Sequence, residues 1–431
     1  MKTPIFPREE YERRVEAVRA ELDRRGLNAI LVSSPENIYY LTGLDHQGYF
    51  AYHVLIVPKQ GTPVLVTRAM ERAVVRDQVP HIRHVGFSDQ PKERLELPER
   101  HDDAVVLATT DASGRAAGLR PWDMSFGVDT REPDGSVDVS APTKATLDAL
   151  REAGASGPIG SEESVPYVSF SIACELRRQA RGIEWRDASG LVDDLRIVQS
   201  PLELERTRQA AVVSDSMMLA AIAAAGPGVA THDVMGAIYD TMFRRGGTYP
   251  GFVPLVRSTR TIEHEHGTWQ DDRLSSRDLL FLEMAGCVRR YHAPMGRLVF
   301  VGKAPRKAEA INAVCRGAME TAAKEIGPGV KAGQVYRVWQ ERLDRAGLSG
   351  YARHHCGYSV GIGFPPSWSG SGVPVGLRNG SEMVLREGMV FHLMSWLLRT
   401  AKGDSFLSDT IVVTRNGSEF LTTVDRGVLV R

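Results

Sequence analysis

A helix start near the middle of the chain, at Ser200, divides the sequence into two halves. Ser200 stands at an N-cap position, Pro201 follows at the first helical position, and Glu203 completes the pattern of a capping box. Helical spacing then continues to about residue 225. The chain has 431 residues, whereas single hydrophobic cores stop growing near about 250–300 residues. We therefore expect two domains, over residues 1–197 and 198–431.

The first half alternates helical and β-rich segments. An amphipathic helix is predicted over residues 8–25, and Gly26 stops it. After it come β-rich runs at 29–32, 54–57, 64–67 and 105–108, and helical stretches at 68–78 and 142–153. This alternation predicts a small α/β domain, with surface insertions within 88–140. The Tyr-rich segment before the Asp45–Gln47 loop is interpreted as a strand.

The second half begins with helices and then interleaves strands with further helices. Helices are predicted over 201–225, 232–245, 305–326 and 333–346, and strands over 252–258, 278–286, 289–302, 389–396 and 409–414. This order favours an α+β domain with a curved antiparallel sheet.

Charge and cysteine usage narrow the class of protein. The chain carries 53 basic and 53 acidic side chains, so no net field favours nucleic acid or an anionic membrane. Its four cysteines lack CxxC spacing, which argues against a disulfide framework and a thiolate zinc site. No run of about 18 apolar residues occurs, and the first residues do not resemble a signal peptide. We expect a cytoplasmic protein whose partner is a small molecule or another subunit.

Three patterns in the second half resemble, in their order and spacing, the creatinase/aminopeptidase P (M24, pita-bread) family. They are the helix start R-I-V-x-S-x-x-E-x-E, a histidine followed after twelve residues by Asp278 and after five more by an acid, and the pair GMVF and DTIVVT. The resemblance covers residues 196–431, and residues 37–58 resemble the small α/β domain of the family. It implies a pita-bread catalytic domain and a homodimer.

The resemblance also locates the family's metal ligands in this sequence. In metal-dependent members five side chains hold two divalent cations, and these positions fall here on Glu283, Pro294, Tyr358, Met394 and Ser408. Hard divalent cations bind carboxylate, imidazole or carbonyl oxygen, and a single carboxylate cannot hold two of them. We therefore expect no metal and no cofactor. The alternative is a register shifted by one or two residues, with His292, His392 or Asp409 as ligands.

Metal-poor members of the family indicate what such a site can do. Creatinase hydrolyses a C–N bond with a histidine that moves protons, and His266 matches the substrate-contacting histidine of the family. The further substrate residues of creatinase fall on Gly296, Ile362, Met394 and Ser408, which argues against creatine as the substrate. Segments 282–297 and 357–368 resemble the ectoine hydrolases. His266 could equally be a solvent-exposed loop histidine.

Glu283 is a candidate catalytic group on physical grounds alone. In the sequence FLEMAG it lies within an otherwise apolar strand, so burial should raise its pKa. Such a carboxyl can act as base or nucleophile near neutral pH. The alternative is a structural ion pair with Arg289, Arg290 or Arg297.

Other residues are predicted to surround the substrate. His354, four residues before Tyr358, is expected to line the pocket, and His292 and His392 are expected to face either the cavity or a polar seam. Trp368 and Trp396 are expected to wall an apolar pocket or to belong to the core. The loop Asp45-His46-Gln47 either reaches the active site of a neighbouring subunit or is merely an exposed polar loop.

These features favour a metal-independent hydrolase that cleaves a non-peptide C–N bond, an amidine or a cyclic amide, in a small amino-acid derivative. Glu283 would attack or activate water, His266 would shuttle the proton, and Tyr358 with His354 would position the substrate. One alternative is an Xaa-Pro metallopeptidase. Another is a non-catalytic pita-bread binding protein.

Overall fold

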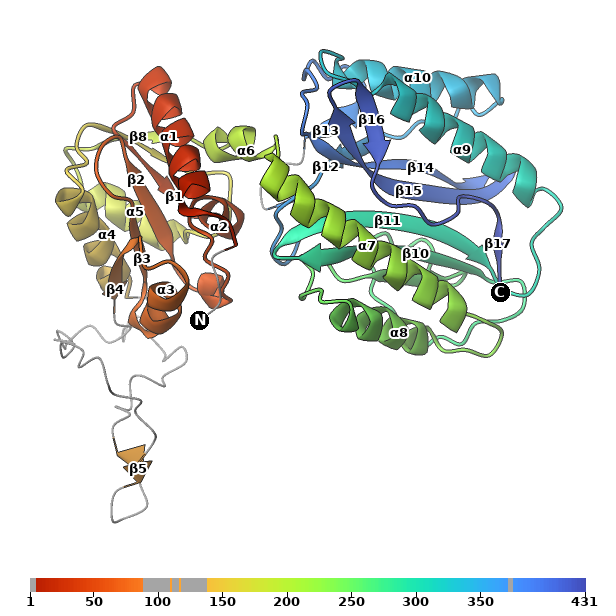
Figure 1. Cartoon of the computed structure of the whole chain (residues 1–431), viewed down its shortest axis with the longest axis horizontal. Coiled ribbons are helices and arrows are strands. Elements are labelled where there is room, and N and C mark those ends of the chain that lie inside the picture. The colour runs from red at the N-terminus through yellow and green to blue at the C-terminus, as the bar shows by residue number, and fades with distance from the viewer. Residues whose placement is uncertain (1–4, 88–108, 111–115, 118–137, 371–374) are drawn as a thin grey trace. The chain divides into compact units, whose positions relative to one another are not determined.

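The computed structural model describes residues 5–87, 109–110, 116–117, 138–370 and 375–431 (Figure 1). The chain divides into two compact units, Met1–Asp193 and Asp194–Arg431. This division falls within a short helix, α6 (Leu191–Arg196), whereas the sequence predicts a boundary directly after it. Each unit builds its main sheet from its own strands. The predicted strand 105–108 lies outside the described residues.

The first unit is built on a mixed six-stranded sheet with the order β4-β3-β2-β1-β7-β8. Its strands are β1 (Ala29–Val32), β2 (Val54–Pro58), β3 (Val64–Arg68), β4 (Arg83–Phe87), β7 (Pro158–Ser161) and β8 (Glu184–Asp187). β1 pairs parallel with β7 and antiparallel with β2. Two further short strands, β5 (Thr109–Thr110) and β6 (Ala116–Ala117), pair with each other.

Helices complete this α/β unit. They are α1 (Arg8–Arg25), α2 (Pro35–Thr42), α3 (Arg72–Gln78), α4 (Ser140–Glu152) and α5 (Phe170–Gln179), with 3-10 turns η1 (Gly48–Phe50) and η2 (Ala69–Glu71). Gly26 ends α1 with φ of 62°, as predicted. The Tyr-rich segment, however, is helix α2 and not a strand. Pro35 opens it at the first helical position, and all eight of its residues are buried, so no helical periodicity marks it in the sequence.

The second unit contains a nine-stranded sheet in which seven strands follow the order β13-β12-β14-β15-β11-β10-β9, and the other two, β16 and β17, pair with β15 and β11. The strands are β9 (Leu255–Ser258), β10 (Leu279–Val288), β11 (Tyr291–Phe300), β12 (His355–Ser359), β13 (Gly376–Arg378), β14 (Val390–Thr400), β15 (Gly403–Thr414), β16 (Gly417–Phe420) and β17 (Leu429–Val430). All pairings are antiparallel except that of β11 with β17. The predicted fold class is confirmed for both units.

The helices that lie wholly within the described part of the second unit are α7 (Pro201–Ala224), α8 (Thr231–Arg244), α9 (Ala308–Glu325) and α10 (Ala332–Arg345). The capping box at the start of α7 is confirmed. The Ser200 hydroxyl accepts a hydrogen bond from the Glu203 amide, and the Glu203 carboxylate accepts one from the Ser200 amide. In the described residues no helix is long and apolar enough to cross a membrane.

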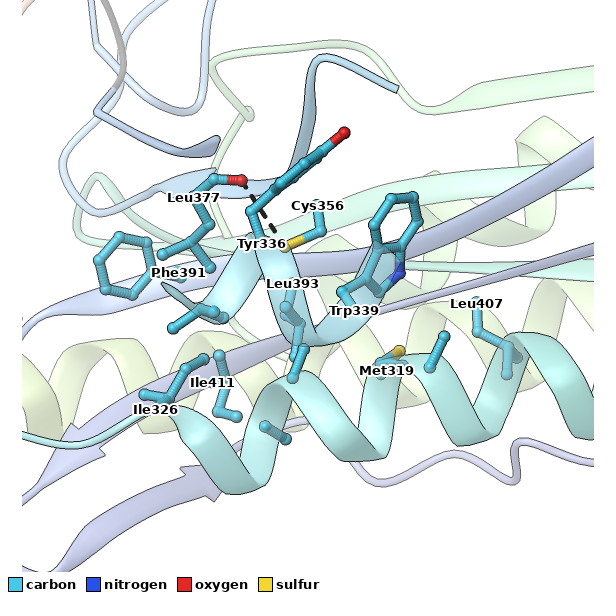
Figure 2. Close-up of a cluster of buried hydrophobic side chains, with 14 of the residues drawn as sticks. Met319, Ile326, Tyr336, Trp339, Cys356, Leu377, Phe391, Leu393, Leu407 and Ile411 are labelled. Carbon is cyan, nitrogen blue, oxygen red and sulfur yellow. Dashed lines mark hydrogen bonds between the residues drawn. The ribbon is translucent and has the colours of Figure 1, made fainter. Parts of the chain in front are cut away.

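One face of the sheet is buried beneath these helices. Figure 2 shows the core between α9, α10 and the strands β14 and β15, where Trp339 packs near Leu393 and Leu407. A second core joins α7 and α8 to β10 and β11, with Leu282, Met284 and Met295 at its centre. Side chains alternate along a strand, so the residues that lie between these core residues in the sequence face the side of the sheet away from the helices.

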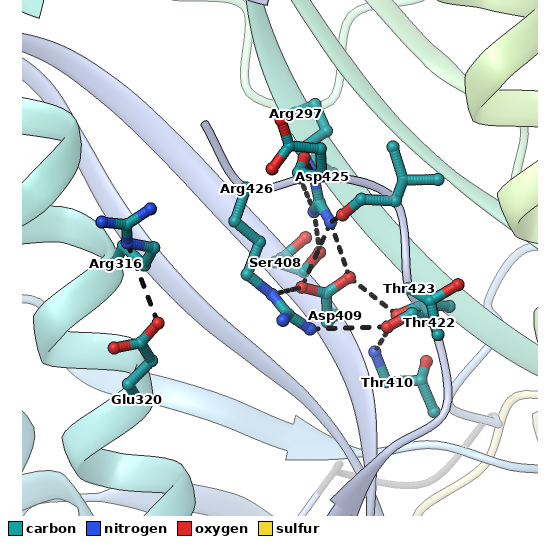
Figure 3. Close-up of polar contacts among 12 residues, drawn as sticks. Arg297, Arg316, Glu320, Ser408, Asp409, Thr410, Thr422, Thr423, Asp425 and Arg426 are labelled. Atoms are coloured by element: carbon teal, nitrogen blue, oxygen red, sulfur yellow. Dashed lines mark hydrogen bonds and ion pairs between the residues drawn. The ribbon is translucent and has the colours of Figure 1, made fainter. Parts of the chain in front are cut away.

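Asp409 lies on the helix side of the sheet within a network of hydrogen bonds (Figure 3). Its carboxylate accepts from Arg297 at 3.0 Å, Arg426 at 2.7 Å and Thr422 at 2.7 Å. Asp409 therefore cannot serve as the metal ligand that a shifted register would require. Arg297 forms its ion pair with Asp409, so it is not the partner of Glu283.

Candidate active site

Two neighbouring rows of paired residues form the floor of a site on the face opposite the helices. In the first row Glu283 pairs with Gly296, Gly296 with Ser408, and Ser408 with Met394. In the second row Ala285 pairs with Pro294, Thr410 with His392, and His392 with Tyr358. Paired residues of antiparallel strands direct their side chains to the same face. The five positions singled out in the sequence therefore gather on one surface.

Side chains from two strands that are not neighbours in the sheet meet on this surface. β10 and β14 are separated by β11 and β15, which in a flat sheet means about 14 Å between their backbones. Nevertheless Glu283 Oε1 lies 3.8 Å from His392 Nε2. The intervening positions hold Gly296 and Ser408, whose small size leaves room for this approach. A Cβ atom on Gly296 would meet the Phe406 ring at 2.2 Å.

A cavity of about 540 Å³ opens above this surface. Of the predicted residues, those that line it are His266, Glu283, His354, Tyr358, Trp368 and Trp396. His266 is exposed and contacts Phe252 edge to face, with ring centroids 6.1 Å apart. The cavity has the size of a small-molecule site.

Glu283 is the buried carboxyl group of the cavity, with 5% of its surface exposed. Burial raises its pKa to about 7, although the positive charges of Arg257 and Arg353 favour its ionised form. Near neutral pH both forms of Glu283 are therefore populated, as general acid–base chemistry requires.

A chain of polar contacts leads from Trp368 to Glu283. Trp368 Nε1 donates to the Tyr358 hydroxyl at 3.0 Å, and this hydroxyl lies 3.1 Å from His392 Nδ1. The roles in the second contact depend on the tautomer of His392; when the Tyr358 hydroxyl donates to Nδ1, the imidazole proton lies on Nε2. That nitrogen has no hydrogen-bond partner among the described residues, and it lies beside Glu283.

His392 stays neutral at physiological pH because burial lowers its pKa to about 3. Burial also raises the pKa of Tyr358 above its ordinary value. The site thus offers an uncharged N–H donor next to a carboxyl that titrates near neutrality. A substrate oxygen or a water molecule beside the two groups would satisfy the donor.

His292 has a different role from His392. Like His392, it is fully buried and is not among the residues that line the cavity. Its Nε2 accepts a hydrogen bond from the Gly251 amide at 2.8 Å, and its Nδ1 faces the Gly361 carbonyl at 3.3 Å. His292 therefore joins two loops. Of the two positions expected from the sequence, the cavity or a polar seam, it occupies the polar seam.

Sequence reasoning did not identify several polar residues near the cavity. Glu265, Arg353, His355 and Arg378 line it, and Arg257 is fully buried close to Glu283. The run Arg353-His354-His355 is a visible signal, because three basic side chains in succession next to a predicted site residue are uncommon. Arg257 lies in an apolar segment, and nothing in the sequence around it indicates that it belongs to the site.

The residues at the five positions do not fit a two-cation centre. They supply one carboxylate, one phenol, one thioether, one hydroxyl and a proline, whereas divalent cations in such centres need several carboxylate or imidazole ligands. Within the described ranges no group of three or more His, Cys, Asp or Glu residues is arranged to hold a metal. No step of the chemistry below is therefore routed through a metal.

Comparisons with known proteins agree with this architecture. The sequence pattern of metallopeptidase family M24 matches residues 205–415, and that of the creatinase/prolidase N-terminal domain matches residues 14–198. The ectoine hydrolase of Halomonas elongata is 26% identical over 99% of this chain and 98% of its own length. An Xaa-Pro dipeptidase of Pyrococcus horikoshii is also 26% identical, over 63% of this chain and 74% of its own. The crystal structure of a prolidase from that organism superposes with a TM-score of 0.74 at 20% identity, covering 97% of this chain and 100% of the other.

Proposed function

The chain belongs to metallopeptidase family M24 and carries a creatinase/prolidase N-terminal domain, and from this premise we propose that it is a metal-independent hydrolase of a non-peptide C–N bond. The bond would be that of an amidine or a cyclic amide in a small amino-acid derivative. The observation that carries the proposal is Glu283, a single buried carboxyl with a pKa of about 7 beside neutral His392.

Hydrolysis at Glu283 can follow either of two routes. As a base, the carboxylate takes a proton from water while the water oxygen adds to the amidine or amide carbon. As a nucleophile, a carboxylate oxygen bonds to that carbon first, and water releases the product afterwards. In the base route the C–N bond breaks as the nitrogen receives the proton that Glu283 took from water. In the nucleophile route Glu283 is bonded to the substrate carbon, so His266 supplies the proton to the leaving nitrogen and takes one from the water that later releases the product.

The remaining residues support binding and orientation. Tyr358 and Trp368 hold His392 in place, so that an Nε2–H can donate to the atom that gains charge, the oxygen of an amide or the nitrogen of an amidine. Phe252, Trp368 and Trp396 give the cavity aromatic walls, which suit a small ring. The likeness to the ectoine hydrolase, which spans nearly the full length of both chains, supports a cyclic amidine as the substrate class.

The second candidate is an Xaa-Pro metallopeptidase. It is favoured by the likeness to the Pyrococcus horikoshii dipeptidase, at the same identity as that to the ectoine hydrolase. The residues at the five positions weigh against it, since a peptidase of this kind needs a two-metal site and Pro294 and Met394 offer such a site nothing.

A substrate panel distinguishes these functions. The purified protein is incubated with ectoine, with creatine and with an Xaa-Pro dipeptide, and the products are quantified. We expect hydrolysis of the cyclic amidine only. Cleavage of the dipeptide would favour the peptidase, whereas tight binding without turnover of any compound would favour a non-catalytic binding protein.

A further inference from the structure

Two guanidinium groups lie against Trp396. Arg353 lies 4.5 Å from the ring centroid and lines the cavity, whereas Arg257 lies 5.5 Å away, is fully buried and does not line it. Within the described part of the chain neither arginine forms an ion pair, and the Nε atom of each has no hydrogen-bond partner. The cavity therefore contains a cation, Arg353, that forms no ion pair with a carboxylate of the described residues.

Basic side chains gather on one side of the cavity. Arg353, His354 and His355 follow one another in the chain, and His355 pairs with Arg378 across β12 and β13. Among the described lining residues the carboxyl groups are Glu265, which is exposed, and Glu283. Burial lowers the pKa of His355 to about 4, so the cations at this end are Arg353 and Arg378, and an anion placed here would gain from both charge and hydrogen bonding.

Arg353 is better suited than Arg378 to hold such an anion. Its side chain is half-buried and stacked on Trp396, so that its planar fork is already oriented. Arg378 is exposed, and water screens its charge. Arg353 is also close enough to Glu283 for its charge to act on that carboxyl, so one small molecule can reach both residues.

We propose that Arg353 binds a free carboxylate of the substrate and thereby selects anionic substrates for this cavity. The proposal rests on the function proposed above and extends it, because an amino-acid derivative can present a carboxylate, an ammonium group or neither. The carboxylate at Arg353 would orient the molecule so that its C–N bond lies over Glu283, between the aromatic walls.

The test measures binding separately from turnover. Two probes are compared by calorimetry on the full chain carrying Glu283→Gln: ectoine, and the analogue in which a hydroxymethyl group replaces its carboxylate. We expect the carboxylate to bind roughly 10-fold or more tightly than the neutral analogue, as a charge-assisted contact implies. Adding Arg353→Met should reduce this preference to about threefold or less, and Arg353→Lys should leave an intermediate preference.

The matched control is Arg378→Met, which removes a cation from the same cavity and should leave the preference within about threefold of its original value. Circular dichroism and thermal unfolding verify that each variant is folded, and Arg353→Lys replaces Arg353→Met if the latter does not fold. The proposal is overturned if neither probe binds, if both bind equally, if the preference survives loss of Arg353, or if it disappears with Arg378.

These outcomes are separable from failure of the proposed function. A carboxylate preference that depends on Arg353, found in a wild-type protein that hydrolyses nothing, would leave the inference standing and reject the hydrolase. Hydrolysis that depends on Glu283, together with equal binding of both probes, would support the hydrolase and reject the role of Arg353.

Discussion

Glu283 is the buried carboxyl group on which the proposed hydrolysis depends. Its apolar neighbours in the sequence were sufficient to predict burial and a raised pKa. Its actual neighbours were not predictable, because His392 and Arg257 lie on other strands and reach Glu283 only through the order of the sheet. Sequence reasoning paired Glu283 with His266; both line one cavity, but the imidazole 3.8 Å from the carboxyl belongs to His392.

The first prediction concerns catalysis by Glu283 and His266. Glu283→Gln keeps the shape of the side chain but removes its basicity and nucleophilicity, so turnover should fall by ~100-fold or more while the substrate still binds. If His266 carries the proton, His266→Ala should lower turnover by a similar factor. Steady-state kinetics should show the double variant barely slower than either single one, because residues that act together are not additive. Additive losses would mean that the two act independently.

The second prediction links the pKa of Glu283 to stability. The folded-state pKa, about 7, lies above the ordinary value, so protonated Glu283 favours folding at low pH and this contribution is lost as the pH rises through 7. Glu283→Gln removes the cost of the buried charge and should stabilise the protein at pH 8.5 by up to about 3 kcal/mol. Urea unfolding of both proteins at pH 5 and pH 8.5 measures this. An equal difference at both pH values would contradict a raised pKa.

The third prediction concerns the hydroxyl of Tyr358. Tyr358→Phe leaves Trp368 Nε1 and His392 Nδ1 without their partner, so turnover should fall by about 10-fold and stability by about 1–3 kcal/mol. Tyr291→Phe is the matched control, since it removes a buried hydroxyl that donates to Glu203, outside the cavity. Activity assays and thermal unfolding should show the control losing stability alone. Equal activity losses in both variants would argue against a specific role of Tyr358.

At the scale of secondary-structure elements, sequence patterns predicted most of what the structure contains. The helices α1, α7, α8, α9 and α10 follow clear periodicity and stop signals, and the predicted strands around Glu283 and His392 are present. The short strand β12, which carries Tyr358, was not identified, because Cys356-Gly357 interrupts any alternation of apolar and polar residues. Helix α2 was misread since all of its side chains are buried.

The fourth prediction tests the network that joins β11, β15 and the segment after β16. Asp409→Asn removes the charge that compensates Arg297, which is fully buried, and Arg426 (Figure 3). Because an uncompensated buried charge is costly, we expect a loss of about 3–5 kcal/mol of stability. Chemical unfolding measures this loss, and the activity of the molecules that remain folded should be unchanged. Full stability with abolished activity would instead indicate that Asp409 belongs to the active site.

At the scale of the whole molecule, the ordered motifs of the sequence sufficed to predict two units and the class of each. The arrangement of the site was less accessible, because it depends on the order of the strands in the sheet, which places Glu283 of β10 within reach of His392 of β14. The homodimer stays a prediction. So does the suggestion that the Asp45–Gln47 loop serves a neighbouring subunit; within its own unit His46 Nδ1 lies 3.3 Å from Glu71 Oε2.

The central claim is that Glu283 drives hydrolysis in a site that does not hold two metal ions. The most direct test is the metal content per chain of the active protein, measured by elemental mass spectrometry on the same sample whose ectoine hydrolysis is assayed before and after chelation. We expect well under one equivalent of any divalent transition metal and an unchanged rate after chelation. About two equivalents per chain, with activity lost on chelation and restored by Mn²⁺, Co²⁺ or Zn²⁺, would contradict it.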